Sequence, residues 1–486
     1  MSKNVKLPKA NERQQYDMLL LSAKEIQAKT GTVYCVLELQ PGREERKIEA
    51  KIWKTDKQTL VSATPEMSVV NLFLTGNEYN GELGYIADTV TPAAGKPGDY
   101  LPASRIDGEK MFDYSKNIVD KYYKDHPGAG AMMRLYDENR EKLIYYPGAL
   151  GVHHAYAGGL IMHMGTCANI CHKIAPVISG KYISAVMGSS TKDIMNQIYM
   201  TLGKSAAGPM VNAAKSAFRT FGCDNQDEAV EKLVTLMLLK KICTSYPFIN
   251  KELLFSAAVM RKISVFTKDP MAEIIGIPAD DMRLVTKFLS AGMIGEENAR
   301  MMRHCMIVDM DNDRNAVIPE AFLIVYAENI AKTIIEHIKN GGEDTDAGTL
   351  VIAAALHDIG KLKELDAEPL GKTEYDINGN MFGHIGMGTE MVLGELEKDS
   401  AADDKTANLI HCVASHHGKL KWGALVEPKT IEAKVLADID YIDSRMDIYD
   451  RCTDVLEEGG KDDSVRKYIG NVVYRPLTKG DEQSPA

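Results

Sequence analysis

The sequence predicts a multidomain chain, with a small β-barrel first and an all-α region after it. Three observations predict this: a length of 486 residues, strand-like segments up to residue 93, and helical periodicity after residue 108. The composition, 45% hydrophobic and 26% charged, is ordinary for a globular protein. No apolar run approaches the ~20 residues that a membrane-spanning helix needs, so we expect no membrane partner.

The first part is expected to be β structure. Five short segments are rich in β-branched and aromatic residues, namely 17–26, 32–40, 46–53, 67–76 and 82–90. Turn signals at 29–31, 41–42 and 80–81 separate them. This spacing suits a small barrel of the OB type, although another five-stranded meander would show the same pattern.

The remainder is expected to be helical. Candidate helices cover 110–125, 129–143, 158–174, 226–243, 251–265, 319–339, 347–361, 385–397 and 404–417. We expect a barrel at 1–93, a linker and a leading helix at 94–128, one helical domain in two parts at 129–176 and 318–456, a helical insertion at 177–317, and a polar tail at 457–486.

Charge and cysteine usage restrict the partners and the compartment. The eight cysteines include no CxxC pair, so we interpret them as structural thiols in a reducing compartment. The polar N-terminal segment lacks the apolar core of a signal peptide, and we expect a cytoplasmic protein. A net charge of −11 argues against broad nucleic-acid binding, yet residues 1–60 contain twelve basic and eight acidic residues. Any polyanion contact is therefore expected near the front of the chain.

Histidines and aspartates recur in an ordered set of helical motifs. AAALHDIGKLKEL (353–365) places His357 and Asp358 after an apolar run, with Lys361 one turn later. A buried His–Asp pair costs free energy unless it is satisfied, and a divalent cation binds both groups. The other motifs carry His153, His154 and His163 (153–165), His384 (383–388), His416 and His417 (414–423), and Asp438, Asp440 and Asp443 (435–447). One motif alone would indicate a core histidine, whereas the ordered set indicates a metal site.

The donor types restrict the metal. No cysteine belongs to the set, so a zinc–thiolate site is not expected. Imidazole and carboxylate donors favour one or two divalent ions, with Mn as the leading expectation and Fe, Co, Ni or Mg as alternatives.

The motif HDIGK, with a histidine upstream and an aspartate downstream, resembles the HD phosphohydrolase superfamily. YYPGALGVHHAYAGGLIMH (145–163), GHIGMG (383–388) and SHHGKLKWGALVEPKTIEA (415–433), which follow an OB-like segment, resemble the YhaM-type 3′–5′ exoribonucleases. The resemblance covers roughly 16–175 and 320–450. It implies an OB-fold joined to an all-α HD domain that here carries a large helical insertion.

The resemblance also implies roles for individual residues. The implied metal ligands are His163, His357, Asp358, His384, His416, His417 and Asp440, with Asp438 as the rival of Asp440. Asp358 and Lys361 would be catalytic. Substrate contacts would come from His153, His154 and Lys361.

The insertion leaves two interpretations of His163 open. In the first, His163 joins His357, Asp358 and Asp440 across the insertion. In the second, the insertion is a degenerate HD-like repeat in which Arg261 and Lys262 replace the His–Asp pair. Residues 246–266 resemble the segment that leads into HDIGK, and His163 would then bind nothing. We favour the first interpretation, because Val325 would otherwise occupy the ligand position and cannot bind a cation.

These features predict a metal-dependent phosphodiesterase, a 3′–5′ exonuclease on single-stranded RNA or alternatively DNA. The barrel would grip the strand by base stacking and phosphate contacts, for which the candidates are Tyr34, Trp53, Tyr79, Tyr85, Lys47, Lys51 and Lys54. For each of these aromatic residues, packing in the barrel core is the alternative role. One alternative function is a phosphodiesterase for cyclic nucleotides, signalling oligonucleotides or nucleotides, which the acidic charge favours. The other is a non-catalytic metal-containing binding or assembly protein. The sequence leaves the oligomeric state open, including a homo-oligomer.

Overall fold

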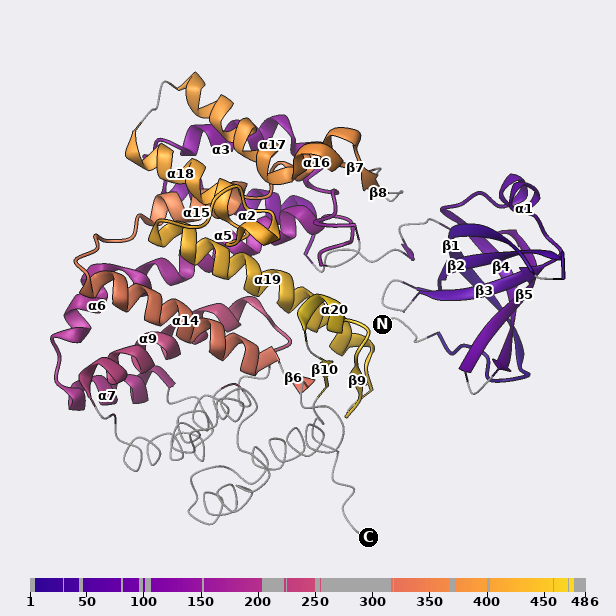
Figure 1. Ribbon diagram of the computed structural model, residues 1–486, viewed down its shortest axis with the longest axis horizontal. Coiled ribbons are helices and arrows are strands. Elements are labelled where there is room, and N and C mark those ends of the chain that lie inside the picture. The colour runs from indigo at the N-terminus through magenta and orange to yellow at the C-terminus, as the bar shows by residue number, and fades with distance from the viewer. Residues whose placement is uncertain are drawn as a thin grey trace, which may run out of the picture. The chain divides into compact units, whose positions relative to one another are not determined.

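The computed structural model divides into two compact units (Figure 1). The first comprises residues 1–110, 140–162 and 362–380, and the second comprises 111–139, 163–361 and 381–486. The structure describes residues 5–475 except 29, 43–46, 80–81, 96–98, 101–105, 151–152, 203–222, 224, 250–253, 255–315, 318, 368–372, 400–402, 458 and 471.

A closed five-stranded barrel forms most of the first unit (Figure 1). Its strands are β1 (Arg13–Gln27), β2 (Val33–Gln40), β3 (Ile48–Trp53), β4 (Ser68–Tyr79) and β5 (Glu82–Pro92). They pair in the order β1-β2-β3-β5-β4, with β3 and β5 parallel. The helix α1 (Lys57–Ala63) joins β3 to β4, and the Asp56 side chain caps it. The five predicted segments and the OB-type barrel are confirmed.

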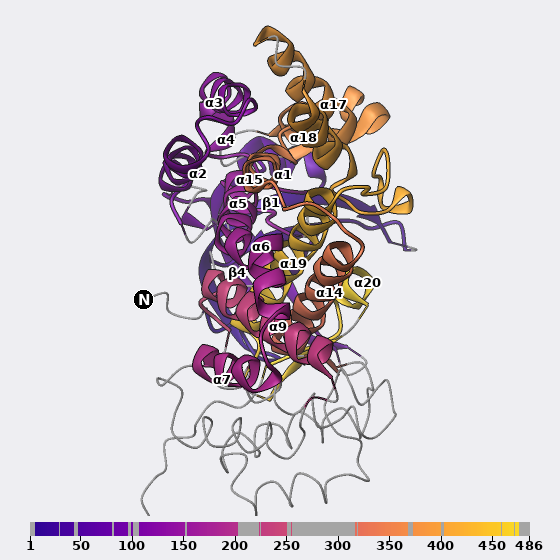
Figure 2. The same cartoon turned by 90° about the vertical axis from the view of Figure 1, so that its left-hand side faces the viewer.

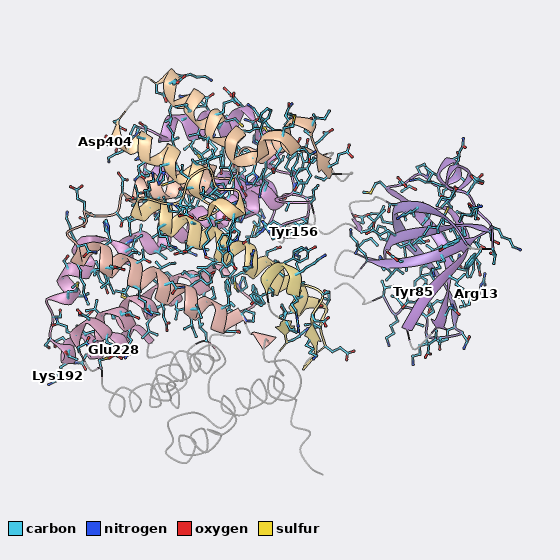
Figure 3. The ribbon with its side chains drawn as sticks, viewed as in Figure 1. Arg13, Tyr85, Tyr156, Lys192, Glu228 and Asp404 are labelled. Atoms are coloured by element: carbon cyan, nitrogen blue, oxygen red, sulfur yellow. The ribbon has the colours of Figure 1, made fainter. Side chains whose placement is uncertain are left out.

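Strand alternation decides which barrel residues face outward. In β3, Ala50 and Ile52 are buried, whereas Lys51 and Trp53 are exposed. Alternation of this kind places one face of a strand in the core and the other in solvent. Tyr85, labelled in Figure 3, packs against the barrel core. Core packing is therefore the better interpretation of Tyr85, while Trp53 lies outside the core.

Short segments complete the first unit. They are the helix α4 (Arg140–Leu143), the helix α16 (Lys361–Glu364) except its first residue, and the hairpin β7 (Leu365–Ala367) with β8 (Thr373–Tyr375). The hairpin was not predicted, because three-residue strands are too short to show an alternating pattern.

Helices dominate the second unit. They are α2 (Gly108–Tyr122), α3 (Ala129–Glu138), α5 (Gly159–Ile178), α6 (Gly180–Met187), α7 (Thr191–Leu202), α9 (Gln226–Ile242), η2 (Cys243–Ser245), α14 (Pro319–Lys339), α15 (Ala347–Leu356), α17 (Ile377–Lys398), α18 (Asp404–Ser415), η5 (Leu420–Trp422) and α19 (Ile431–Val455). Most predicted helices that the structure describes are present with bounds within a few residues. The exceptions are α17, which begins eight residues before the predicted start at 385, α15, which ends five residues before the predicted end at 361, and the predicted helix 129–143, which is divided into α3 and α4. No described helix is long and apolar enough to cross a membrane.

The helix α15 is the centre of this unit (Figures 1 and 2). Its residues from Gly348 to Leu356 are all buried, and it packs against α18 and α19. The Asp346 side chain begins the helix by accepting hydrogen bonds from the Gly348 and Thr349 amides. Because α15 is buried on every side, its C-terminal end delivers His357 and Asp358 into the interior.

The structure describes part of the predicted insertion and part of the predicted polar tail. The described parts of 177–317 include α6, α7 and α9, and α9 packs against α14. Arg261 and Lys262 lie outside the described residues, so the degenerate repeat stays a prediction. Within the expected polar tail, β9 (Lys461–Asp462), α20 (Arg466–Ile469) and β10 (Val472–Tyr474) form, and β6 (Ala316–Val317) pairs with β10. The tail is thus more ordered up to residue 475 than its composition suggests.

Candidate metal centre

Helices distant in sequence bring seven predicted ligands into one cluster in the second unit. α5 supplies His163, α17 supplies His384 and α19 supplies Asp440. The ends of α15 and α18 supply the remaining four, His357 with Asp358 and His416 with His417. The cluster therefore depends on the packing of the whole helical unit.

The carboxylate of Asp358 lies at the centre of this cluster. Its Oδ2 is 3.5 Å from His163 Nε2 and 3.6 Å from His357 Nε2. Its Oδ1 is 3.3 Å from His384 Nε2 and 3.5 Å from His416 Nε2. Each oxygen thus faces a different group of imidazoles, so Asp358 could contribute a ligand to each group if both held a metal ion.

Asp440 completes the first group of donors. Its Oδ1 lies 3.1 Å from His163 Nε2 and 3.8 Å from His357 Nε2, and the two Nε2 atoms are 3.1 Å apart. Two ligands of one ion, each ~2.1 Å from it, lie about 3 to 3.5 Å apart, so these spacings fit a common ion. The rival carboxylate, Asp438, pairs instead with Lys434 at 2.5 Å. The geometry supports the interpretation in which His163 joins the site.

The second group consists of three histidines. Donor atoms of His384, His416 and His417 lie within 4.8 Å of one another. Asp358 Oδ1 and His416 Nε2 are buried and have no hydrogen-bond partner among the described residues. Buried polar atoms of this kind are costly unless something satisfies them, and a divalent ion would satisfy both. The residues therefore fit a metal.

Backbone carbonyls orient three of the rings. The Nδ1 atoms of His357, His416 and His417 lie 2.8, 2.7 and 2.7 Å from the carbonyl oxygens of Ala354, Val413 and Trp422 respectively. A carbonyl only accepts, so each Nδ1 carries the proton and donates it. Each Nε2 then presents a lone pair to the cluster, as a metal ligand must.

A carboxylate orients His163 in the same way. Its Nδ1 lies 2.7 Å from Asp443 Oδ2, and the other oxygen of Asp443 accepts from the Tyr246 hydroxyl at 2.8 Å. Tyr246 is buried and belongs to the insertion. Asp443 belongs to the predicted aspartate motif but was assigned no role, and Tyr246 was not predicted to contribute. The i,i+3 spacing of Asp440 and Asp443 on α19 could have indicated that Asp443 lies near the cluster. No sequence pattern indicates a role for Tyr246.

Burial and charge set the protonation of the cluster. Burial lowers the pKa of His357 to about 3 and that of His417 to about 4, so both rings are neutral at neutral pH. Burial alone would raise the pKa of Asp358, but Lys361 and the histidines hold it well below its usual range. Burial opposes a proton on His163, yet Cys167 and the carboxylates raise its pKa overall. An ion bound there would displace that proton.

Lys361 lies within this cluster. Its Nζ is 2.6 Å from Asp358 Oδ2, and both side chains are buried. The ammonium therefore balances the Asp358 carboxylate in this structure, whereas the sequence suggested a contact with a phosphoryl oxygen. That substrate contact stays a prediction.

Two glycines fix the position of His384. Gly383 has φ 66° and interrupts α17 directly before His384, as the sequence predicts for a helix start. Gly360 lies so close to α17 that a Cβ there would overlap the His384 carbonyl oxygen and lie 2.5 Å from the Gly388 amide. The turn after Asp358 and the start of α17 thus pack backbone against backbone.

The predicted substrate-binding histidines belong to the first unit. His154 is buried with φ 49°, and its carbonyl accepts from the amides of Gly148 and Tyr156 at 2.8 and 2.9 Å. His153 packs edge-on against it, with ring centroids 6.0 Å apart. These contacts describe a constrained turn, and the substrate role of both histidines stays a prediction.

The structure places some of the predicted substrate-contact residues of the barrel close together. Tyr34 and Trp53 pair across β2 and β3 with ring centroids 4.5 Å apart, and Trp53 is 44% exposed. Lys51 lies two residues before Trp53 on the same outer face. Lys47 forms an ion pair with Glu38 at 3.2 Å. The side chain of Tyr79 lies outside the described residues.

One protein family matches the part of the helical unit that holds most of the His–Asp cluster. The family model described as "HD domain" matches residues 325–445. This range contains every clustered ligand except His163, which the structure adds from α5. Over this range the chain is similar to HD domains, and over part of its length it is similar to the YhaM proteins.

The curated relatives carry the name 3′-5′ exoribonuclease YhaM. The protein of Bacillus subtilis (strain 168) is 34% identical over 159 residues, 32% of this chain and 48% of that protein. The Bacillus velezensis protein is 33% identical over 159 residues, with the same coverage. That of Oceanobacillus iheyensis is 29% identical over 232 residues, 42% of this chain and 71% of that protein. The chain spans about half the length of the first of these relatives. No solved structure shows a significant match.

Proposed function

We propose that this protein is a metal-dependent phosphodiesterase that degrades single-stranded RNA from its 3′ end in the cytoplasm. The observation that carries the proposal is the buried Asp358 carboxylate, whose two oxygens each face a separate group of imidazole nitrogens. The relatives are named 3′-5′ exoribonucleases, which supports the direction of degradation and the RNA substrate.

Two sets of residues would hold the ions. His163, His357 and Asp440 would hold the first, His384, His416 and His417 would hold the second, and Asp358 would belong to both. A bound divalent ion, with Mn as the first to test, lowers the pKa of water and polarises a phosphodiester.

The chain's own residues prepare this site. The carbonyls of Ala354, Val413 and Trp422 hold three imidazoles in the tautomer that binds metal. Asp443 does the same for His163. Lys361 keeps Asp358 ionised and supplies a cation where negative charge of a phosphoryl group would accumulate.

The barrel supports a single-stranded substrate. An aromatic pair, the partly buried Tyr34 and the exposed Trp53, lies beside Lys51 on the outer face of β2 and β3. Single-strand-binding barrels combine base stacking on aromatic rings with cations that follow the phosphates. His153 and His154 remain candidates for further substrate contacts.

A substrate panel with added Mn²⁺ tests the proposal. Labelled single-stranded RNA, single-stranded DNA, cyclic nucleotides and dNTPs would be compared under the same conditions. We expect RNA to be shortened stepwise from its 3′ end. Hydrolysis of cyclic nucleotides with RNA left intact would favour the alternative phosphodiesterase, which the net charge of −11 suits. Metal binding without hydrolysis of any substrate would favour the non-catalytic protein.

A further inference from the structure

An exposed aromatic and cationic surface lies beside the metal centre, on the turn between α18 and α19. We call it the Trp422 surface, and its members are Lys419, Lys421, Trp422, Tyr441 and Arg445. The Trp422 indole stacks on the Tyr441 ring, with centroids 5.6 Å apart and planes 13° from parallel. Trp422 is nonetheless 45% exposed. Tyr441 therefore supports an indole that still presents much of its area to solvent.

The backbone ties this surface to the metal centre. The Trp422 carbonyl accepts the Nδ1 proton of His417 at 2.7 Å, and Tyr441 directly follows Asp440 on α19. The turn is itself held by the Trp422 amide donating to the Lys419 carbonyl at 2.9 Å. A nucleotide whose phosphodiester lay at the ligand cluster would therefore have the Trp422 surface within reach.

Among the described residues, no carboxylate forms an ion pair with the cations of this surface. The Nζ atoms of Lys419 and Lys421 lie 4.7 and 5.7 Å from the centroid of the Trp422 ring. The guanidinium carbon of Arg445 lies 4.2 Å from the centroid of Tyr441. Within the described part of the chain, no ion pair is found for any of the three, although the protein carries a net charge of −11. Aromatic rings with unpaired cations are the combination that binds bases and phosphates of a single strand.

We propose that the Trp422 surface binds the nucleobase of the nucleotide whose phosphodiester is cleaved. The base stacks on the Trp422 indole, and Lys419, Lys421 and Arg445 bind the flanking phosphates. This inference rests on the proposed function and narrows its substrate to a strand with an unstacked base next to the scissile bond. Every base has a π-face, so the site accepts all four bases and rejects abasic positions.

Trp422 can be tested as its own fluorescent reporter, because the chain contains two tryptophans, Trp53 and Trp422. The Trp53→Phe variant leaves Trp422 as the single indole. AMP, CMP and a single-stranded RNA of about ten nucleotides would be titrated into this variant in EDTA, so that no hydrolysis occurs. We expect saturable quenching that weakens as the salt concentration rises. Ribose 5-phosphate, which has no base, should not quench.

Kinetic measurements then distinguish base stacking by Trp422 from a role of Trp422 in holding the metal site. Trp422→Ala retains the backbone carbonyl that binds His417, so Mn²⁺ affinity should stay within about twofold of wild type. Loss of one stacked base costs about 5- to 150-fold in kcat/KM on RNA. RNA with abasic residues at its 3′ end should show no such loss. Trp422→Phe, which keeps an aromatic face, should recover most of the activity. The matched control is Phe382→Ala, which removes an aromatic that is 63% exposed two residues before His384.

The outcomes distinguish this inference from the proposed function. Quenching by AMP in a protein that cleaves no nucleic acid would support the base site and reject the nuclease. If the protein cleaves RNA but Trp422→Ala is as active as wild type on normal RNA, or loses activity equally on normal and abasic strands, the base site is overturned and the nuclease stands. A base-dependent loss in Phe382→Ala, but not in Trp422→Ala, would also overturn it.

Discussion

Tyr246→Phe should weaken metal binding at the half of the centre that contains His163. The Tyr246 hydroxyl donates a hydrogen bond of 2.8 Å to Asp443, and Asp443 orients the His163 ring through a contact of 2.7 Å. The variant therefore removes a buried hydrogen-bond donor that acts on the proposed ligand His163 through Asp443. A hydrogen bond to a charged group contributes about 1.5–3 kcal/mol. Loss of a group that orients a ligand costs about 10- to 100-fold in metal affinity, which corresponds to about 1.4–2.7 kcal/mol. The two estimates agree.

Mn²⁺ titration followed by electron paramagnetic resonance measures this effect directly. We expect one of two sites to weaken by about 10- to 100-fold while the other is unchanged. The matched control is Tyr123→Phe, which loses a hydrogen bond of 2.7 Å to His172, another histidine of α5 that lies outside the cluster. Unchanged Mn²⁺ affinity in Tyr246→Phe, or an equal loss in Tyr123→Phe, would refute the reasoning.

Two further predictions concern backbone packing and the barrel. Gly360→Ala should lower the melting temperature and the Mn²⁺ stoichiometry, because its Cβ would overlap the His384 carbonyl. Gly386→Ala, whose Cβ would meet nothing within 4 Å, should be tolerated, so equal effects of the two would reject this explanation. Trp53→Ala should weaken binding of a long single strand by about 1–3 kcal/mol in a fluorescence anisotropy titration. Cleavage of a dinucleotide should be unaffected, and unchanged long-strand affinity would assign the barrel another role.

Local patterns were enough to predict most of the fold and the residues that gather in the His–Asp cluster. The strands of the barrel alternate clearly, and β3 shows the buried positions Ala50 and Ile52 between exposed residues. The ligand motifs could be recognised because His357 and Asp358 are adjacent in sequence and follow an apolar helix. The glycine before His384 also marks a break within α17, since Gly383 has a positive φ.

Long-range contacts could not be predicted in this way. Tyr246 and Asp443 are 197 residues apart, and a buried tyrosine hydroxyl leaves no periodic signal. The pairing of Lys361 with Asp358 depends on how deeply both side chains are buried, which spacing alone does not determine. The stack of Trp422 on Tyr441 likewise joins a turn to a helix, and it follows only from the packing of α18 against α19.

Cleavage of end-labelled RNA by wild type and Asp358→Asn tests the central claim most directly. Asparagine keeps the shape of the side chain but removes the charge that both groups of imidazoles and Lys361 face. With Mn²⁺ and RNA labelled at its 5′ end, we expect wild type to give a ladder that shortens from the 3′ end. The variant should lose several orders of magnitude in rate, because the ions it would no longer hold generate the nucleophile. A folded Asp358→Asn protein that retains more than about a tenth of the wild-type rate would contradict the account.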